Sequence, residues 1–222
     1  MYWNYLVPLI AMFMVVRYRY PLPNAALPLL PRIKMMLGGM AVAAGLCLLV
    51  NSSLALYHDI GLYQRSIEGP FFPTLLATTS SVVIEELFFR GVLFLLLLAF
   101  FPAWCAIFIS SLAFGVFHWF SYGVFGNLAA MLAVAITTGS FGAVMCYAYL
   151  RSNTLLVPFA IHAGWNLSNA LVIDISGQQL ALLSTPQPVP KDWAGFFAFS
   201  AVVIVLLLFI RLTVYGSRTQ AS

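Results

Sequence analysis

The scarcity of charge along this chain constrains its fold more than any other feature. Of its 222 residues, 63% are hydrophobic and only 7% are charged, whereas a soluble globular domain carries about 25% charged residues. A monomer this apolar could not cover itself with a hydrated surface. We therefore take the lipid bilayer to be its solvent, and we expect the lengths of its helices to follow the thickness of a membrane.

Seven apolar segments, separated by polar or proline-rich breaks, predict an all-α, polytopic bundle of transmembrane helices with about seven spans. The predicted helices cover residues 1–16, 35–57, 74–100, 104–120, 128–150, 154–174 and 193–212. Most reach the ~20 residues that a span needs, and the first is short enough to lie partly in the interface. It lacks the basic start and the cleavage site of a signal peptide. A single integral-membrane domain, residues 1–222, accounts for the whole length.

The basic residues predict the orientation of the bundle. With seven spans, one side holds only Arg65 and Lys191, and the other side holds seven basic residues: Arg17, Arg19, Arg32, Lys34, Arg151, Arg211 and Arg218. Because lysine and arginine accumulate in cytoplasmic loops, we expect the N-terminus outside and the C-terminus in the cytoplasm, in a plasma membrane of bacterial type. The basic residues form no stripe or patch, so a nucleic-acid partner is not expected.

Two further features of the sequence carry no functional prediction. The cysteines Cys47, Cys105 and Cys146 all fall inside apolar segments without the spacing of a metal or redox site, and we interpret them as small buried residues. The longest polar break, residues 177–191, suggests no chemistry by its composition.

Three charged residues lie where charge is costly. Glu85, Glu86 and Arg90 fall in one apolar segment, and the two glutamates lie about a dozen residues from either end of its predicted helix. An ionised group at that depth costs at least ~2.5–3.5 kcal/mol. Glu86 and Arg90 are four residues apart and can pair on one helix face. Glu85 points about 100° away and needs a partner on another helix or a proton, so it is a candidate base. A buried structural network of all three residues is the alternative.

Two histidines, His118 and His162, also lie within predicted spans. A single histidine in a membrane helix is more often an interhelical hydrogen-bonding group than a catalytic one, but here the pair accompanies the one unpaired intramembrane carboxylate. His162 and Asn166 are four residues apart and share a face, and two such donors fit an oxyanion hole. A helix–helix bridge by Asn166 fits equally well. Gly115 and Gly164, near the histidines, predict close helix packing.

These residues together resemble a known family. Glu85-Glu86-x-x-x-Arg90, Phe114-x-x-x-His118 and His162-x-x-x-Asn166 look like the three motifs of the CAAX-protease and bacteriocin-processing family, which includes the Rce1-type and Abi proteins. The resemblance covers a catalytic core of about residues 74–169. It implies an intramembrane endopeptidase of the glutamic type, acting on a peptide or a membrane-anchored protein.

The resemblance also implies roles for individual residues. Glu85 would activate water, His118 would hold and polarise that water, and His162 with Asn166 would stabilise the oxyanion, while Glu86 and Arg90 would support the site. We expect no cofactor. The alternative is a zinc-dependent version of the same protease, with Glu85, His118 and His162 as ligands, whose types suit zinc.

Two other functions remain open at this point. A proton-coupled transporter would also place ionisable residues inside the membrane, although the sequence has none of the repeats common in transporters. A non-catalytic immunity protein could keep the same fold. All catalytic versions need His118 and His162 at one depth, yet the first lies near the outer end of its predicted helix and the second nearer the cytoplasmic end of its own.

Overall fold

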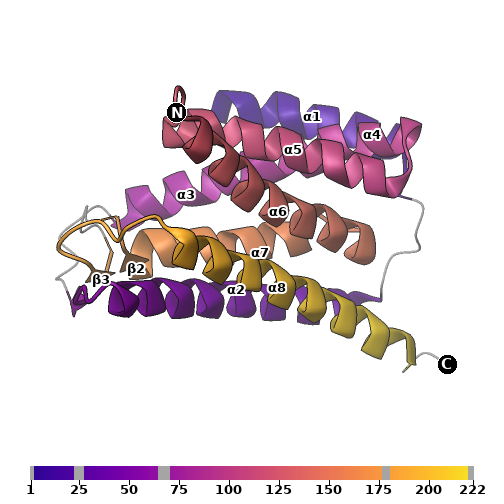
Figure 1. The fold of residues 1–222 in the computed structure, drawn as a ribbon. Coiled ribbons are helices and arrows are strands. Elements are labelled where there is room, and N and C mark those ends of the chain that lie inside the picture. Colours follow the sequence, from indigo (N-terminus) through magenta and orange to yellow (C-terminus); the bar gives the residue numbers. More distant parts are fainter. Residues whose placement is uncertain (1–2, 23–27, 65–70, 177–180, 220–222) are drawn as a thin grey trace.

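The computed structural model describes residues 3–22, 28–64, 71–176 and 181–219, and in this part of the chain it is an all-α bundle (Figure 1). Residues 1–2 of the first predicted helix, Arg65 and residues 177–180 of the long polar break lie outside the described residues. Seven continuous helical segments run through the rest: α1 (Trp3–Arg19), α2 (Leu29–Tyr57), α3 (Phe71–Glu86) with η1 (Leu87–Phe94) and α4 (Leu95–Phe100), α5 (Ala103–Tyr122), α6 (Leu128–Ser152), α7 (Leu156–Leu167) with η2 (Ser168–Val172), and α8 (Trp193–Thr219). The predicted fold class is confirmed.

The helix boundaries differ from the predicted ones mainly at α2, α7 and α8, and α8 continues to Thr219 rather than ending at residue 212. Helix α2 begins at Leu29 rather than at residue 35, because a proline in the first turn of a helix, here Pro31, loses no intrahelical hydrogen bond. The sixth predicted helix stops at Val172, and its last two predicted residues form strand β2 (Ile173–Asp174). Segments η1 and η2 are π-helices, which hydrophobic spacing does not reveal.

A small sheet closes one end of the bundle. Strand β3 (Leu183–Ser184) pairs antiparallel with β1 (Tyr63–Gln64) and parallel with β2, in the order β1-β3-β2. Each strand has two residues, too few for an alternating pattern to be recognised in the sequence. The sheet holds the chain between η2 and α8 against the C-terminal end of α2 (Figure 1).

Four of the described helices are long and apolar enough to cross a membrane: Leu29–Tyr57, Ala103–Tyr122, Leu128–Ser152 and Trp193–Thr213. Together with the composition they make this an integral membrane protein. The predicted count of seven spans is not confirmed, since α1 has 17 residues and α7 has 12, fewer than the ~20 that cross the hydrocarbon core.

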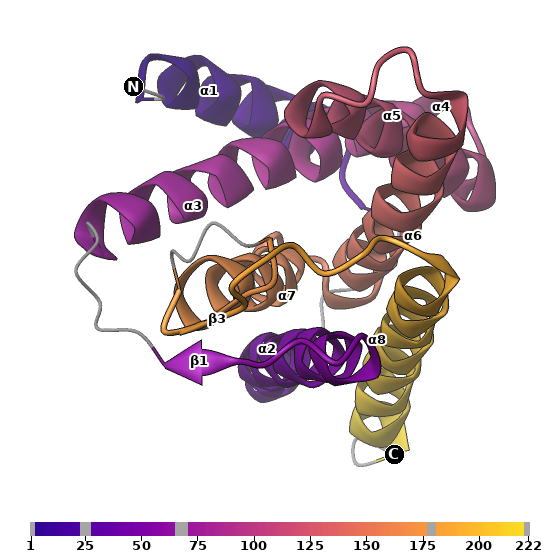
Figure 2. The same cartoon turned by 60° about the vertical axis from the view of Figure 1, so that its left-hand side comes forward.

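Glycine residues allow the central helices to approach closely, as predicted. A Cβ on Gly115 of α5 would lie 2.5 Å from the carbonyl oxygen of Ala135 on α6, and a Cβ on Gly164 of α7 would overlap the carbonyl oxygen of Met40 on α2. Helix α7 lies between α2 on one side and α3 on the other (Figure 2). Its short length and central position make α7 the buried element around which the polar site is built.

Candidate active site

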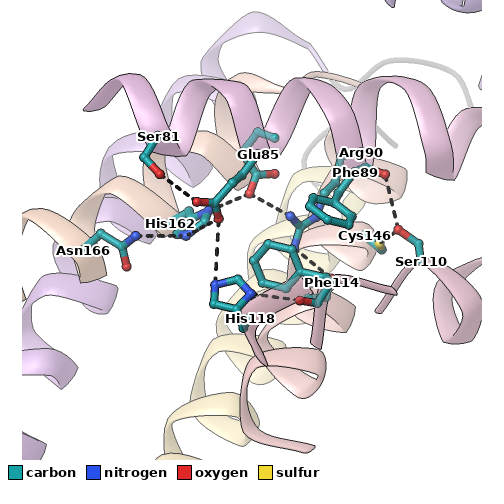
Figure 3. Close-up of polar contacts among 12 residues, drawn as sticks. Ser81, Glu85, Phe89, Arg90, Ser110, Phe114, His118, Cys146, His162 and Asn166 are labelled. Carbon is teal, nitrogen blue, oxygen red and sulfur yellow. Dashed lines mark hydrogen bonds and ion pairs between the residues drawn. The ribbon is translucent and has the colours of Figure 1, made fainter. Parts of the chain in front are cut away.

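Three helices bring a carboxylate and two imidazole rings together. Glu85 lies near the end of α3, His118 near the end of α5 and His162 in α7, and their side chains point toward one another (Figure 3). The Oε2 atom of Glu85 lies 3.8 Å from Nε2 of His162 and 4.0 Å from Nε2 of His118. One carboxylate oxygen therefore faces both rings at separations somewhat longer than a hydrogen bond.

Ser81 orients the Glu85 carboxylate. Its hydroxyl donates a 2.8 Å hydrogen bond to Oε1 of Glu85, one helical turn further along α3. The other oxygen, Oε2, is buried, and no described group makes a hydrogen bond with it. Sequence analysis gave Ser81 no role, although the four-residue spacing that places both side chains on one helix face was visible.

His118 presents one ring nitrogen to Glu85 and uses the other on its own helix. Its Nδ1 lies 2.8 Å from the carbonyl oxygen of Phe114, so Nδ1–H donates to that carbonyl and Nε2 of the neutral ring keeps its lone pair. The side chain is 14% exposed, against 3% for His162. His118 thus faces the more open side of the site.

His162 lies between a carboxylate and an amide. Its Nδ1 is 2.7 Å from Oε1 of Glu86, and its Nε2 is 3.1 Å from the amide nitrogen of Asn166. A neutral ring that donates Nδ1–H to Glu86 accepts the Asn166 N–H at Nε2. The carboxylate fixes the tautomer and the plane of the ring. In this arrangement the Asn166 amide donates to Nε2 of His162. Only a His162 ring that is protonated at both nitrogens would have an Nε2–H to direct toward the Glu85 carboxylate.

Glu86 and Arg90 form the predicted pair. Nη1 of Arg90 lies 3.1 Å from Oε1 of Glu86, and the two side chains are 0% and 2% exposed. The guanidinium stacks over the ring of Phe114 at 4.2 Å from its centroid. Because Oε1 of Glu86 serves both Arg90 and His162, the buried pair and the site ring belong to one polar network.

The two histidines share one depth, as the site requires. His118 is four residues from the end of α5, and α7 is short and begins only six residues before His162. The C-terminal ends of both helices lie at the end of the bundle that carries the small sheet (Figure 1). The predicted difference in depth between His118 and His162 disappears because α7 has 12 residues and is not a full span.

The zinc alternative requires Glu85, His118 and His162 as ligands of one metal ion. Among the described residues, no group of three or more His, Cys, Asp or Glu side chains is arranged to hold a metal ion. The atoms that would bind zinc are Oε2 of Glu85 and the Nε2 atoms of His118 and His162, and the two nitrogens lie 4.0 and 3.8 Å from that oxygen. Nε2 of His162 is engaged by the amide nitrogen of Asn166 at 3.1 Å. The bonds to Ser81 and Glu86 leave the three candidate ligand atoms free, so metal dependence is a question for the chelation experiment below.

A comparison with known families identifies this part of the chain. Residues 67–168 match the model described as Type II CAAX prenyl endopeptidase Rce1-like. Every candidate site residue falls inside that range. No curated protein and no solved structure matches the chain.

Proposed function

The chain carries a Rce1-like type II CAAX prenyl endopeptidase domain at residues 67–168, and from this premise we propose a metal-free intramembrane endopeptidase with Glu85 as its general base. The family is one of peptide-bond hydrolases, so the substrate is a peptide or a protein. The proposal concerns which groups perform the hydrolysis. It is supported by the convergence of Glu85, His118 and His162 from three helices.

The first step of the proposed reaction uses the space between Glu85 and His118. A water molecule hydrogen-bonded to both Oε2 of Glu85 and Nε2 of His118 bridges atoms about 4 Å apart. Glu85 takes a proton from this water, and the resulting hydroxide attacks the carbonyl carbon of the scissile bond. Ser81 keeps Oε1 occupied, so Oε2 is the oxygen directed at the water. The proton then passes to the amide nitrogen as the C–N bond breaks.

The developing oxyanion is assigned to His162 and Asn166. This role requires a His162 ring that carries a proton on both nitrogens before the attack: as the oxygen gains negative charge, its Nε2–H and the amide N–H of Asn166 can both turn to it. Glu86 accepts from Nδ1 and stabilises the positive charge of that ring. Arg90 limits the cost of burying the Glu86 carboxylate.

One observation carries this proposal: Oε2 of Glu85 is a buried carboxylate oxygen that no described group satisfies, and it faces two imidazole nitrogens. Unsatisfied buried acceptors are uncommon and point to a functional use. The decisive variant is Glu85→Gln, which keeps an acceptor for Ser81 but removes the base.

We expect Glu85→Gln to lower kcat by a factor of about 10²–10⁴. The measurement is cleavage of a fluorogenic, prenylated CAAX peptide by protein purified in detergent. Ser200→Ala is the matched control, because that hydroxyl bonds to the Phe196 carbonyl of its own helix α8. Full activity of Glu85→Gln contradicts the proposal, and Glu85-dependent proton uptake without cleavage would favour a transporter.

The same assay distinguishes a metal-dependent mechanism. We expect activity to survive prolonged incubation with a chelator and to show no increase when zinc is added back. Loss of activity on chelation, restored by zinc, would favour the His118, His162 and Glu85 site.

We also propose that the end of the bundle with the basic residues faces the cytoplasm of a cell with a bacterial-type plasma membrane. Arg17 and Arg19 end α1, Arg32 lies in the first turns of α2, and Arg151 is in the last turn of α6. Arg17 also donates a hydrogen bond to Asn153, just beyond α6. This clustering supports the orientation expected from the sequence.

A further inference from the structure

One aromatic ring at the centre of the site, that of Phe114, has no part in the hydrolysis as proposed above. Phe114 lies on α5, one turn before His118, and its side chain is 1% exposed. The centroid of its ring lies 4.5 Å from that of His118 and 5.9 Å from that of His162 (Figure 3). A buried ring that contacts both imidazoles is well placed to position them.

The Phe114 ring also contacts the buried cation of the site. The central guanidinium carbon of Arg90 lies 4.2 Å from the ring centroid, well inside the limit of about 6 Å for a cation–π contact. Such contacts are strongest away from water, and the Arg90 side chain is 0% exposed. The hydrogen bond from its Nη2 to the Gly142 carbonyl oxygen is long, at 3.5 Å, so the ring face is a main contact that holds the guanidinium.

Arg90 passes this constraint on to His162 through a single oxygen atom. Nη1 of Arg90 lies 3.1 Å from Oε1 of Glu86 as an ion pair, and the same Oε1 accepts from Nδ1 of His162 at 2.7 Å. The ring, the guanidinium, the carboxylate and the imidazole therefore form a chain of direct contacts. Because a carboxylate partner sets the orientation of an imidazole, the position of Arg90 affects that of the His162 ring.

The backbone of Phe114 acts on the other histidine, and the ring itself is fixed by packing. Its carbonyl oxygen accepts from Nδ1–H of His118 at 2.8 Å. The ring meets that of Phe89 edge-on at 5.0 Å, and a Cβ on Gly142 of α6 would lie 3.2 Å from its Cδ1 atom. One rigid residue thus contacts the supports of both histidines.

We propose that Phe114 is a positioning residue for both histidines. Its carbonyl sets the tautomer of His118, and the negative face of its ring holds Arg90 so that Glu86 keeps His162 in place. The inference rests on the proposed function, because it adds a residue to the same site. It differs from a packing role in one property, the electrons of the ring: an aliphatic side chain could fill the space but would not attract the cation.

The test changes the electrons of the ring and nearly preserves its shape. Phenylalanine carrying one, two or three ring fluorine atoms is incorporated at Phe114, because each fluorine withdraws electrons from the ring face and weakens a cation–π contact. The matched control is the same series at Phe94, which is 0% exposed and whose ring lies 6.5 Å from that of Tyr149. Phe114→Leu removes the ring and keeps the carbonyl.

Three quantities are measured on each protein in detergent. They are kcat and KM for the prenylated CAAX peptide, the temperature of thermal unfolding, and the exchange rate of the Arg90 guanidinium N–H protons in heavy water, followed by nuclear magnetic resonance without substrate.

We expect kcat to fall with each fluorine at Phe114, by about tenfold in total with three, while KM and the unfolding temperature change little. Phe114→Leu should be at least as slow. The guanidinium N–H protons of Arg90 should exchange faster in the trifluorinated protein, because the contact that holds this buried group is weakened. The Phe94 series should leave all three quantities at their wild-type values.

Four outcomes would overturn the inference. Full activity of the trifluorinated Phe114 enzyme would leave the ring a packing role only, and an equal loss in the Phe94 series would show a general effect of fluorine. A higher KM at constant kcat would assign the ring to substrate binding. A lower kcat with unchanged proton exchange at Arg90 would mean that the ring acts on the histidines directly.

Failure of the proposed function gives a different result. In that case the wild type cleaves no CAAX peptide, whereas the exchange measurement, which needs no substrate, still reports whether the Phe114 ring holds Arg90.

Discussion

At the level of single residues, the two neighbouring glutamates of α3 have different surroundings. Glu86 is enclosed by Arg90 and His162: its Oε1 accepts a hydrogen bond from Nδ1 of His162 and lies 3.1 Å from Nη1 of Arg90 as an ion pair. Glu85 has one oxygen bonded to Ser81 and the other directed at two imidazole nitrogens. A full turn of α3 separates Ser81 from Glu85, so the serine belongs to the site although no motif includes it. The contribution of Ser81 can be measured separately from that of Glu85, the proposed base.

We expect Ser81→Ala to lower kcat about tenfold and to leave KM nearly unchanged. Without the hydrogen bond to Oε1, the Glu85 carboxylate can rotate, but the proposed base is still present. The expected rise in the activation free energy is ~1.5 kcal/mol. The measurement is the steady-state cleavage assay. Ser80→Ala is the matched control, since Ser80 is adjacent and points about 100° away. Equal effects of the two variants would assign Ser81 a packing role only.

At the level of elements, the site depends on how closely α7 can approach its neighbours. Gly164 lies against the backbone of Met40 on α2, and His162, two residues earlier in α7, reaches Glu86 on α3. Asn51 of α2 donates a 3.0 Å hydrogen bond to Asn169 in η2, which fixes the other end of the same segment. The position of His162 and Asn166 is therefore set by the contact between α2 and α7.

We expect Gly164→Ala to destabilise the protein by about 1–3 kcal/mol, because the added methyl meets a backbone carbonyl that cannot move aside easily. Gly45→Ala on α2 is the control: no atom lies within 4 Å of its added methyl, so replacing this helical glycine should be neutral or stabilising by up to ~1 kcal/mol. Thermal unfolding in detergent measures both. Comparable losses in the two variants would contradict close α2–α7 packing as the cause.

At the level of the whole molecule, the two ends of the bundle differ in chemistry. One end gathers the basic residues of α1, α2 and α6, and the opposite end carries the three-stranded sheet and Lys191 (Figure 1). The C-terminal ends of α5 and α7, near His118 and Asn166, lie at the end of the bundle that carries the sheet. The orientation of the bundle therefore also decides from which side a substrate reaches Glu85.

We expect a green fluorescent protein fused to the C-terminus to fluoresce in bacterial cells, because that end of α8 belongs with the basic residues and should stay in the cytoplasm. The companion fusion carries alkaline phosphatase, which is active only outside the cytoplasm, and should be inactive. The opposite pattern would reverse the orientation and place the sheet end, with Lys191, in the cytoplasm.

The sequence by itself determined the solvent and the fold class, and it named Glu85, His118, His162 and Asn166 as candidates for the site. A chain with so few charges must fold in a bilayer, and a carboxylate at mid-depth without a partner on its own helix must find one elsewhere. The pairing of Glu86 with Arg90 followed from their spacing alone, since neighbours on one helix are fixed by helical geometry.

Only the tertiary structure decided what lies between helices. The contacts of Glu85 with both histidines, the bond from His162 to Glu86 and the contact of Lys191 with the Tyr122 ring join residues 33 to 77 positions apart in the chain. The short length of α7 and the two π-helical segments could not be predicted from the sequence either, because apolar residues in a membrane protein continue past the ends of helices and show no periodic pattern. Local spacing fixes neighbours within a helix, and packing fixes neighbours between helices.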